Sequence, residues 1–313
     1  MKVIPIHGHE NWLCDRYASE WMESNISHAP DCYNVNHADA LWLLAPWEWR
    51  NIPEDHLNKK KIICTIHHIV PDKMSDEAWN EFKERDKYVD AYHTPCLKSW
   101  DQFSKYTNNK PHLIQPFWSN GSIFYPYKKE VKPQLRFKYG LGIDSFVVGS
   151  FQRDTEGRDL KSPKLEKGPD ILCDILEKVN EKKPNLEVLL SGWRRQYVIG
   201  RLENAGIKYK YIELPSIDVI NELYNCLDQY IVAARHEGGP QSVSECIMTK
   251  TPIVSTRVGL AEKFLHPNSL FADQESFFEA TSDEESLHYS SKILEPYLMP
   301  QGFDNFNSFF ESI

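Results

Sequence analysis

Short apolar runs alternate with amphipathic segments along most of the chain, and this alternation constrains the fold more than any other feature. Residues 38–47 and 60–70 each contain an apolar stretch that is typical of a strand buried on both faces of a sheet. Residues 168–183 have the three- and four-residue spacing of a helix. Strands that alternate with helices of this length predict parallel sheets built from β-α-β units.

The alternation runs through the chain twice, with a change of character between the two halves. A length of 313 residues fits two domains of roughly 150 residues. We predict an α/β fold of two Rossmann-like domains that face each other across a cleft, with ligands at the carboxyl ends of the strands. The predicted parts are a first domain, a Pro- and Gly-containing basic linker, a second domain, and an aromatic tail that crosses the domain junction and packs back on the first domain (1–130, 131–145, 146–282 and 283–313).

Charge and cysteine usage exclude several classes of protein. The formal net charge is -9, from 36 basic and 45 acidic residues. We therefore expect no nucleic-acid partner, because duplex binders neutralise phosphates with Lys and Arg. The seven cysteines form no C-x-x-C pair. Their odd number argues against a disulfide framework and predicts free thiols in the cytoplasm.

The distribution of apolar and basic residues also indicates how the protein could associate with a membrane. No run of about 18 apolar residues occurs, so we predict no transmembrane segment. The first residues lack the long apolar region of a signal peptide. The basic cluster at 128–138 could touch an anionic membrane surface. We favour a solvated linker as the explanation of that cluster.

The stretch from 229 to 256 carries the strongest chemical signal. A buried strand runs into a Gly238-Gly239 turn, and a helix follows at Pro240 and Gln241. Glycines let a ligand approach the backbone closely. The free amides and positive dipole end of a helix N-terminus bind anions. This arrangement predicts a phosphate or sugar site.

Two glutamates flank that helix N-terminus. Glu237 lies in the loop at the end of the strand, where its carboxylate can reach a bound ligand. Glu245 lies within the first two helical turns and can accept hydrogen bonds from vicinal hydroxyls, as acids do for ribose in dinucleotide sites. The alternative is that both are ordinary acids and that Glu245 is merely solvated.

Cations follow the first strand of the second half. Arg153 comes directly after it, and Lys167 lies before Gly168 at the start of the next helix. Two cations beside a helix N-terminus suit a diphosphate. Alternatively, they are surface cations on a flexible loop. The loop is long, so other basic residues within it could take over their role (Arg158, Lys161 and Lys164).

Taken in order, these motifs resemble the retaining family-4 glycosyltransferases, which have the GT-B fold. The resemblance covers about residues 145–265 and rests on five motifs: GSFQR at 149–153, EKG at 166–168, EGGPQSVSE at 237–245, TPIVST at 251–256 and GLAE at 259–262. The first half is similar to the family only in outline.

The resemblance implies a role for each matching residue. Arg153 and Lys167 would hold the donor diphosphate and stabilise the charge that builds on the leaving group. Glu237 would contact the donor sugar near its reacting end, and Glu245 would bind the nucleotide ribose. The backbone around Gly238, Gly239, Pro240 and Gln241, with the amides that it offers, would face sugar or phosphate.

The first half contributes two further candidates. The family often has a strand that ends in a His which reaches the donor sugar, and here His67 or His68 matches, with His67 favoured. A structural histidine at a strand end is the alternative for either. Gly8, in the first strand-to-helix turn, matches the glycine loop of the family. The departure at Leu214 to Ser216, where the family has a glycine, leaves the base unassigned.

No metal or cofactor is predicted. Metal-dependent transferases need an Asp-x-Asp to hold a divalent ion against the diphosphate, and no two aspartates here are two apart. His7-x-His9 has no supporting Cys or carboxylate cluster in the sequence.

The resulting prediction is a metal-independent retaining glycosyltransferase of hexosyl type. Its donor substrate would be a nucleotide-diphosphate sugar, and its acceptor would be a sugar, a polysaccharide, a lipid-linked group or a protein. The alternatives are an inactive nucleotide-sugar- or glycan-binding protein of the same fold, and a sugar-nucleotide epimerase.

Overall fold

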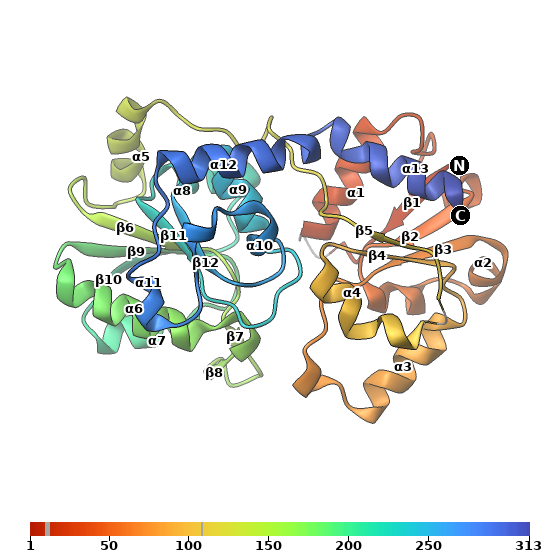
Figure 1. Cartoon of the computed structure of the whole chain (residues 1–313), viewed down its shortest axis with the longest axis horizontal. Coiled ribbons are helices and arrows are strands. Elements are labelled where there is room, and N and C mark those ends of the chain that lie inside the picture. Colours follow the sequence, from red (N-terminus) through yellow and green to blue (C-terminus); the bar gives the residue numbers. More distant parts are fainter. Residues whose placement is uncertain (10–12, 108) are drawn as a thin grey trace. The chain divides into compact units, whose positions relative to one another are not determined.

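The computed structural model describes residues 1–9, 13–107 and 109–313, and the chain divides into two compact units. The first unit comprises Met1–Trp118 and Tyr297–Ile313, and the second comprises Ser119–Pro296. Each unit contains a parallel sheet with helices, which confirms the prediction of two Rossmann-like α/β domains (Figure 1). The predicted start of the first helix at Asn11 lies outside the described residues.

The first unit is built on a five-stranded parallel sheet in the order β1-β2-β3-β4-β5. Alternate side chains face opposite sides, as the two-residue period of a strand requires. Val3 and Trp42 pack into one core, whereas Ile4 and Leu41 pack into the other. The five strands are β1 Val3–Ile6, β2 Ala40–Leu43, β3 Lys61–Thr65, β4 Ala91–Thr94 and β5 His112–Ile114.

Helices cover both faces of this sheet, and α3 begins after a residue that caps it. Ser75 caps α3, since its Oγ accepts a hydrogen bond from the Ala78 amide at 3.3 Å. After α1 the chain passes the outer edge of β1, where the Val3 amide donates to the His28 carbonyl at 2.8 Å. The helices of this unit are α1 Leu13–Ser24, α2 Glu54–Lys59, α3 Asp76–Asp86, α4 Leu97–Phe103 and α13 Asp304–Ser312.

The C-terminal tail completes the first core, as predicted. Phe306 and Phe310 of α13 are fully buried against Trp42, with ring centroids 5.3 and 5.1 Å apart from it. Trp21 of α1 also packs on Phe310, with ring centroids 5.5 Å apart. Burial of large aromatic rings is what fixes this distant segment on the first unit.

The second unit has a six-stranded parallel sheet in the order β10-β9-β6-β11-β12-β13. The chain fills one side from the centre outward and then returns to fill the other, so the order reverses between β6 and β11. In open α/β sheets such a reversal marks the ligand-binding crevice. The strands are β6 Phe146–Ser150, β9 Leu186–Ser191, β10 Lys208–Ile212, β11 Gln229–Val232, β12 Ile253–Thr256 and β13 Leu270–Phe271.

Four short elements of the second unit were not expected from the sequence. Strand β13 follows β12, the strand that contains most of the TPIVST motif at 251–256. The long loop after β6 contains a small antiparallel hairpin, β7 Thr155–Glu156 with β8 Ser162–Pro163. Helix α5 Lys132–Lys138 lies within the segment predicted as a linker. Two-residue strands are too short to leave a periodic pattern in a sequence.

The other helices of this unit pack on its sheet and on one another (Figure 1). Their bounds are α6 Pro169–Lys182, α7 Gln196–Asn204, α8 Ile217–Asn225, α9 Gln241–Thr249, α10 Ala261–Phe264, α11 Gln274–Phe277 and α12 Glu284–Leu294. Within the described part of the chain, no helix has the length and apolar character that crossing a membrane requires.

Candidate functional site

The candidate site lies in the second unit, at the carboxyl ends of β6 and β11. Arg153 follows β6 within three residues, and the loop 233–240 follows β11. These neighbouring strands flank the reversal in strand order, and the loops that follow them lie where open α/β sheets bind ligands.

The loop after β11 is fixed to the turn before α6. The amides of Arg235 and His236 both donate to the Glu166 carbonyl, at 2.9 and 3.0 Å. The Arg235 guanidinium also pairs with Asp170 in the first turn of α6 at 2.6 Å. The loop and the turn are therefore held as one rigid structure.

Gly168 allows that close approach. It has φ of 63°, and a Cβ at this position would lie 1.8 Å from the Ala233 carbonyl oxygen. Only glycine fits such a contact in a left-handed conformation. The Lys-Gly pair noticed in the sequence thus has a backbone reason, since the glycine sets the lysine against the loop.

Lys167 and Glu237, predicted separately from two motifs, are in direct contact. The Lys167 Nζ forms an ion pair and hydrogen bond with the Glu237 Oε2. Both side chains are mostly buried, with 16% and 14% of their surface exposed. Such a pair is partly shielded from water, so its charges interact more strongly than on an open surface.

Other cations gather beside this pair. Burial lowers the pKa of Lys164, and the positive charges of Lys167 and Arg153 lower it further. Burial also lowers the pKa of Arg153, and Arg194 adds to the effect. Partly buried positive groups that repel one another form a region suited to an anion.

The remaining candidates from the long loop lie elsewhere. Arg158 and Lys161 are exposed in the β7–β8 hairpin. Asp159 accepts hydrogen bonds from the amides of Lys161 and Ser162, which fixes the turn of the hairpin. Of the alternatives to Arg153 and Lys167 that the sequence left open, Lys164 is therefore the one that the fold places beside them.

The glycine loop is packed tightly against the GLAE turn. A Cβ on Gly259 would lie 2.3 Å from the Gly238 carbonyl oxygen and 2.5 Å from that of Glu237. Gly238 is buried and Gly239 is partly exposed. Helix α9 begins at Gln241, one residue after Pro240, and is nine residues long. Its N-terminal amides lie next to the loop that carries Glu237.

Glu245 is buried within α9, with 8% of its surface exposed. The Tyr224 hydroxyl donates to its Oε2 at 2.8 Å. Burial, together with the nearby Glu245 charge, raises the pKa of Tyr224 well above its ordinary value. The alternative in which Glu245 is a solvated helix acid is therefore wrong. No sequence signal identified Tyr224 as its partner.

A second buried pair supports the loop that carries Arg153. Arg195 has none of its surface exposed, and its Nε donates to Asp154 Oδ2 at 2.5 Å. Its Nη1 also donates to the Ser191 carbonyl at 2.7 Å. Next to it, the Arg153 guanidinium lies over the Trp193 ring at 5.1 Å. Sequence reasoning missed all of these contacts, because nothing in their spacing indicates them.

Two predicted residues lie in the first unit. Gly8 is exposed in the loop between β1 and α1. His67 follows β3, and its Nε2 lies 2.8 Å from the Leu44 carbonyl oxygen. Its ring stacks on Phe117 with centroids 5.9 Å apart. These contacts hold the His67 ring in one orientation at the carboxyl end of the strand. His68 is partly exposed.

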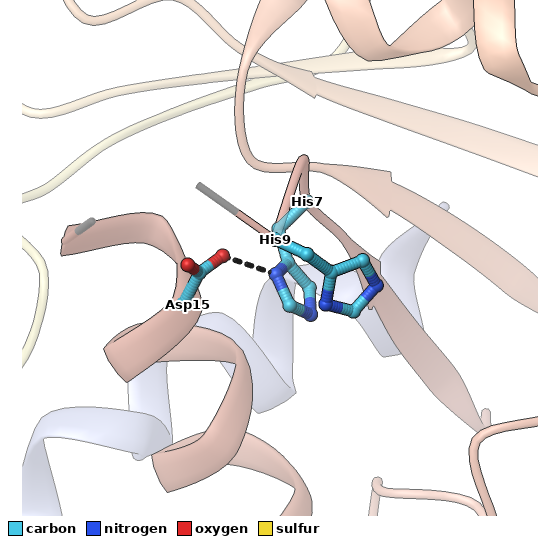
Figure 2. Close-up of side chains that lie close together, drawn as sticks. All are labelled: His7, His9 and Asp15. Atoms are coloured by element: carbon cyan, nitrogen blue, oxygen red, sulfur yellow. Dashed lines mark hydrogen bonds and ion pairs between the residues drawn. The ribbon is translucent and has the colours of Figure 1, made fainter. Parts of the chain in front are cut away.

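The same unit contains a cluster that the sequence did not predict. The His7 Nδ1 lies 2.5 Å from Asp15 Oδ1, and the His9 ring is 4.1 Å from the His7 ring (Figure 2). His7-x-His9 had been set aside for want of a carboxylate. The first turn of α1 supplies one, because it brings Asp15 back to the end of β1.

Comparison with protein families agrees with the motifs. The model for glycosyl transferases group 1 matches residues 160–283. The predicted resemblance is confirmed over that part of the chain, which contains Lys167 and both glutamates, whereas Arg153 precedes it. A search of curated proteins finds no match.

Solved structures agree on the fold. HepE of Anabaena, in complex with UDP-glucose, has a TM-score of 0.69 at 14% identity, over 89% of this chain and 80% of its own. Sucrose-phosphate synthase of Thermosynechococcus elongatus has a TM-score of 0.65 at 12% identity, covering 88% and 75%. The pneumococcal O-GlcNAc transferase GtfA, in complex with UDP and GlcNAc, has a TM-score of 0.61 at 14% identity, covering 87% and 56%. The fold is therefore of the GT-B type.

Proposed function

We propose that this protein is a retaining glycosyltransferase that takes a sugar from a nucleotide-diphosphate donor without a metal ion at the diphosphate. The family match and the GT-B fold support the class of enzyme. HepE and GtfA were solved with UDP or UDP-glucose, which makes a uridine nucleotide the first donor to test. A hexose is the proposed sugar, and the acceptor is left open.

The contact between Lys167 and Glu237 is the observation that carries this proposal. When no donor is bound, each side chain neutralises the other. A donor diphosphate would compete for Lys167, because it offers more negative charge than one carboxylate. Glu237 would then be released toward the sugar hydroxyls. One pair thus couples binding of the diphosphate to positioning of the sugar.

The charge that develops during transfer lies on the leaving nucleotide diphosphate. Arg153, Lys164 and Lys167 supply fixed positive charge where that negative charge grows, which is an electrostatic form of catalysis. The N-terminus of α9 adds its dipole. Glu245, held by Tyr224, would accept hydrogen bonds from the ribose hydroxyls.

The test compares two lysines of one loop. Lys167→Ala should lower kcat/KM for donor hydrolysis or transfer by about 10²- to 10³-fold, as removal of one transition-state donor does elsewhere. Glu237→Gln should keep UDP binding and lower turnover. Lys161→Ala, which removes the same charge from the exposed hairpin, is the matched control and should behave like the wild type.

The outcomes separate the alternatives. Wild-type turnover in both Lys167→Ala and Glu237→Gln would refute the assigned site. Calorimetric binding of nucleotide sugars with neither hydrolysis nor transfer would instead indicate a binding protein. A change in the sugar without any acceptor would indicate an epimerase.

A further inference from the structure

Two imidazoles and one carboxylate meet between β1 and α1 of the first unit. His7 and His9 come from the loop after the strand, and Asp15 comes from the first turn of the helix (Figure 2). One possible ligand atom from each of the three side chains lies within 4.8 Å of those of the other two. This cluster lies outside the residues assigned to donor binding in the second unit.

We propose that His7, His9 and Asp15 bind a divalent transition-metal ion of the zinc class. Imidazole and carboxylate are ligands that Zn²⁺ accepts, whereas Mg²⁺ and Ca²⁺ prefer oxygen ligands alone. Two ligands of a tetrahedral zinc ion lie about 3.4 Å apart, given metal–ligand distances of about 2.1 Å. The three donor atoms, within 4.8 Å of one another, are close to that spacing.

The local backbone brings the third ligand into place. His9 has φ of 52°, in the left-handed region that few residues other than glycine adopt. The hydrogen bond between His7 and Asp15 joins two of the residues, and the His9 ring packs on the His7 ring with centroids 4.1 Å apart. A shared cation would join this third side chain to the pair.

Burial and charge at the cluster also suit a cation. The His7 side chain is only 8% exposed and that of Asp15 is 24% exposed, so both ligands are held by surrounding structure. The Asp15 carboxylate offsets the repulsion between a cation and the positive end of α1. A site of this chemistry would tie the loop after β1 to the helix that follows it.

Three protein ligands leave the fourth zinc position open, as in zinc sites that bind water or a substrate oxygen. The loop lies at the carboxyl end of β1, the edge where parallel sheets bind ligands. The proposed ion differs in chemistry from a diphosphate-bound Mg²⁺, and the proposal does not depend on the transfer reaction assigned to the second unit.

The experiment uses the whole chain, stripped with a chelator and dialysed. Titration with Co²⁺, followed by visible absorption, reports the number of ions bound and the tetrahedral geometry, and competition with Zn²⁺ gives the affinity. His9→Ala is the principal variant because His9 is exposed, so its loss should leave folding intact. Asp15→Asn removes the charged ligand. Thermal unfolding in chelator checks that each variant is folded.

His37→Ala is the matched control. His37 is exposed and lies 3.4 Å from the Cys32 thiol, so it represents the kind of surface pair that binds metal adventitiously. We expect one ion per chain in the wild type and in His37→Ala. Affinity should fall by about 100-fold or more in His9→Ala, because even outer-shell partners account for about 10- to 100-fold. Absence of tetrahedral Co²⁺ bands in the wild type, or equal affinity in His9→Ala, would overturn the proposal.

Discussion

The two units are built on the same kind of parallel sheet, yet their cores differ in chemistry. The core that α13 closes in the first unit is dominated by large aromatic rings, including Trp21, Trp42, Trp118, Phe306 and Phe310. The main core of the second unit is largely aliphatic, built from Leu, Ile and Val of its strands and helices. The first core therefore depends on a few large rings, and some of them come from the far end of the chain.

Their buried polar groups differ as well. In the aromatic core of the first unit, uncharged side chains are linked by hydrogen bonds. Trp42 Nε1 donates to Thr65 Oγ1, and His93 Nδ1 lies 3.0 Å from that hydroxyl oxygen. In the second unit a charged pair, Arg195–Asp154, is buried just after β6. That pair supports the loop that carries Arg153, where an anionic donor is proposed to bind, whereas the bonds among Trp42, Thr65 and His93 lie within the core of the first unit.

The largest expected effect comes from breaking the aromatic core. Phe306→Ala removes a fully buried ring that packs on Trp42 and His93. The free energy of unfolding of the first unit should fall by about 3–5 kcal/mol. Eight of the nine tryptophans precede Ser119, so intrinsic fluorescence reports mainly on this unit.

Leu190→Ala in the second core is the matched variant. Leu190 is fully buried among aliphatic residues, and its truncation should cost about 2–5 kcal/mol. It should lower the unfolding midpoint seen by far-UV circular dichroism and leave the fluorescence midpoint largely unchanged. A single transition that both variants shift equally would contradict the view of two units with separate cores.

Lowering the pH below about 6.5 should reduce the stability of the first unit before that of the second. Burial lowers the pKa of His93 to about 3, against 6.5 in an unfolded chain. Between these values the unfolded state binds the extra proton, so stability falls as the pH falls. The expected loss is about 1.4 kcal/mol per pH unit, or about 3 kcal/mol between pH 6.5 and about pH 4.

The second unit should not respond in the same range. The partnered Asp228 and Asp170 have a lowered pKa, so their stabilisation is present above their ordinary value of 3.8 and is lost only at lower pH. Fluorescence-detected unfolding at pH 4 to 6.5 should therefore show a steep loss that His93→Gln reduces. An equal slope in that variant would show that His93 is not the source.

The sequence predicted the main strands because a strand that is buried on both faces of a sheet consists of a continuous apolar run. Residues 60–70 contain β3, and residues 251–256 contain β12. It could not predict β13, the β7–β8 hairpin or α5, since short elements take their stability from neighbours that are distant in sequence. The aromatic tail was predicted to return to the first domain, but not the rings it would meet there.

The candidate site was also predicted only in part, because residues within one motif were found and their partners from other elements were not. Motifs of adjacent residues indicated Lys167 and Glu237, and the fold brings them into contact. Partners that come from separate elements left no signal, as with Tyr224 beside Glu245 and Asp15 beside His7. Spacing along a chain predicts contacts within a helix or turn, whereas contacts between elements depend on the packing of the whole unit.

The smallest expected effect compares two buried tyrosines. Tyr224 donates to Glu245 at 2.8 Å in the second unit, and Tyr92 donates to Asp86 at 2.7 Å in the first. Replacing either by Phe removes one hydrogen bond to a carboxylate, which costs about 2 kcal/mol of stability. Only Tyr224→Phe should also weaken UDP binding, by about tenfold or about 1.4 kcal/mol, because it frees the carboxylate proposed to hold the ribose.

Calorimetry with UDP at a temperature well below both unfolding transitions separates the two consequences. If Tyr92→Phe loses as much UDP affinity as Tyr224→Phe, the loss follows from general destabilisation and Glu245 has no special position. If stability falls equally in the two variants and affinity falls in Tyr224→Phe alone, the hydrogen bond orients a ligand-binding group. The contrast between the units would then be one of function, since the same bond in the first unit serves the fold only.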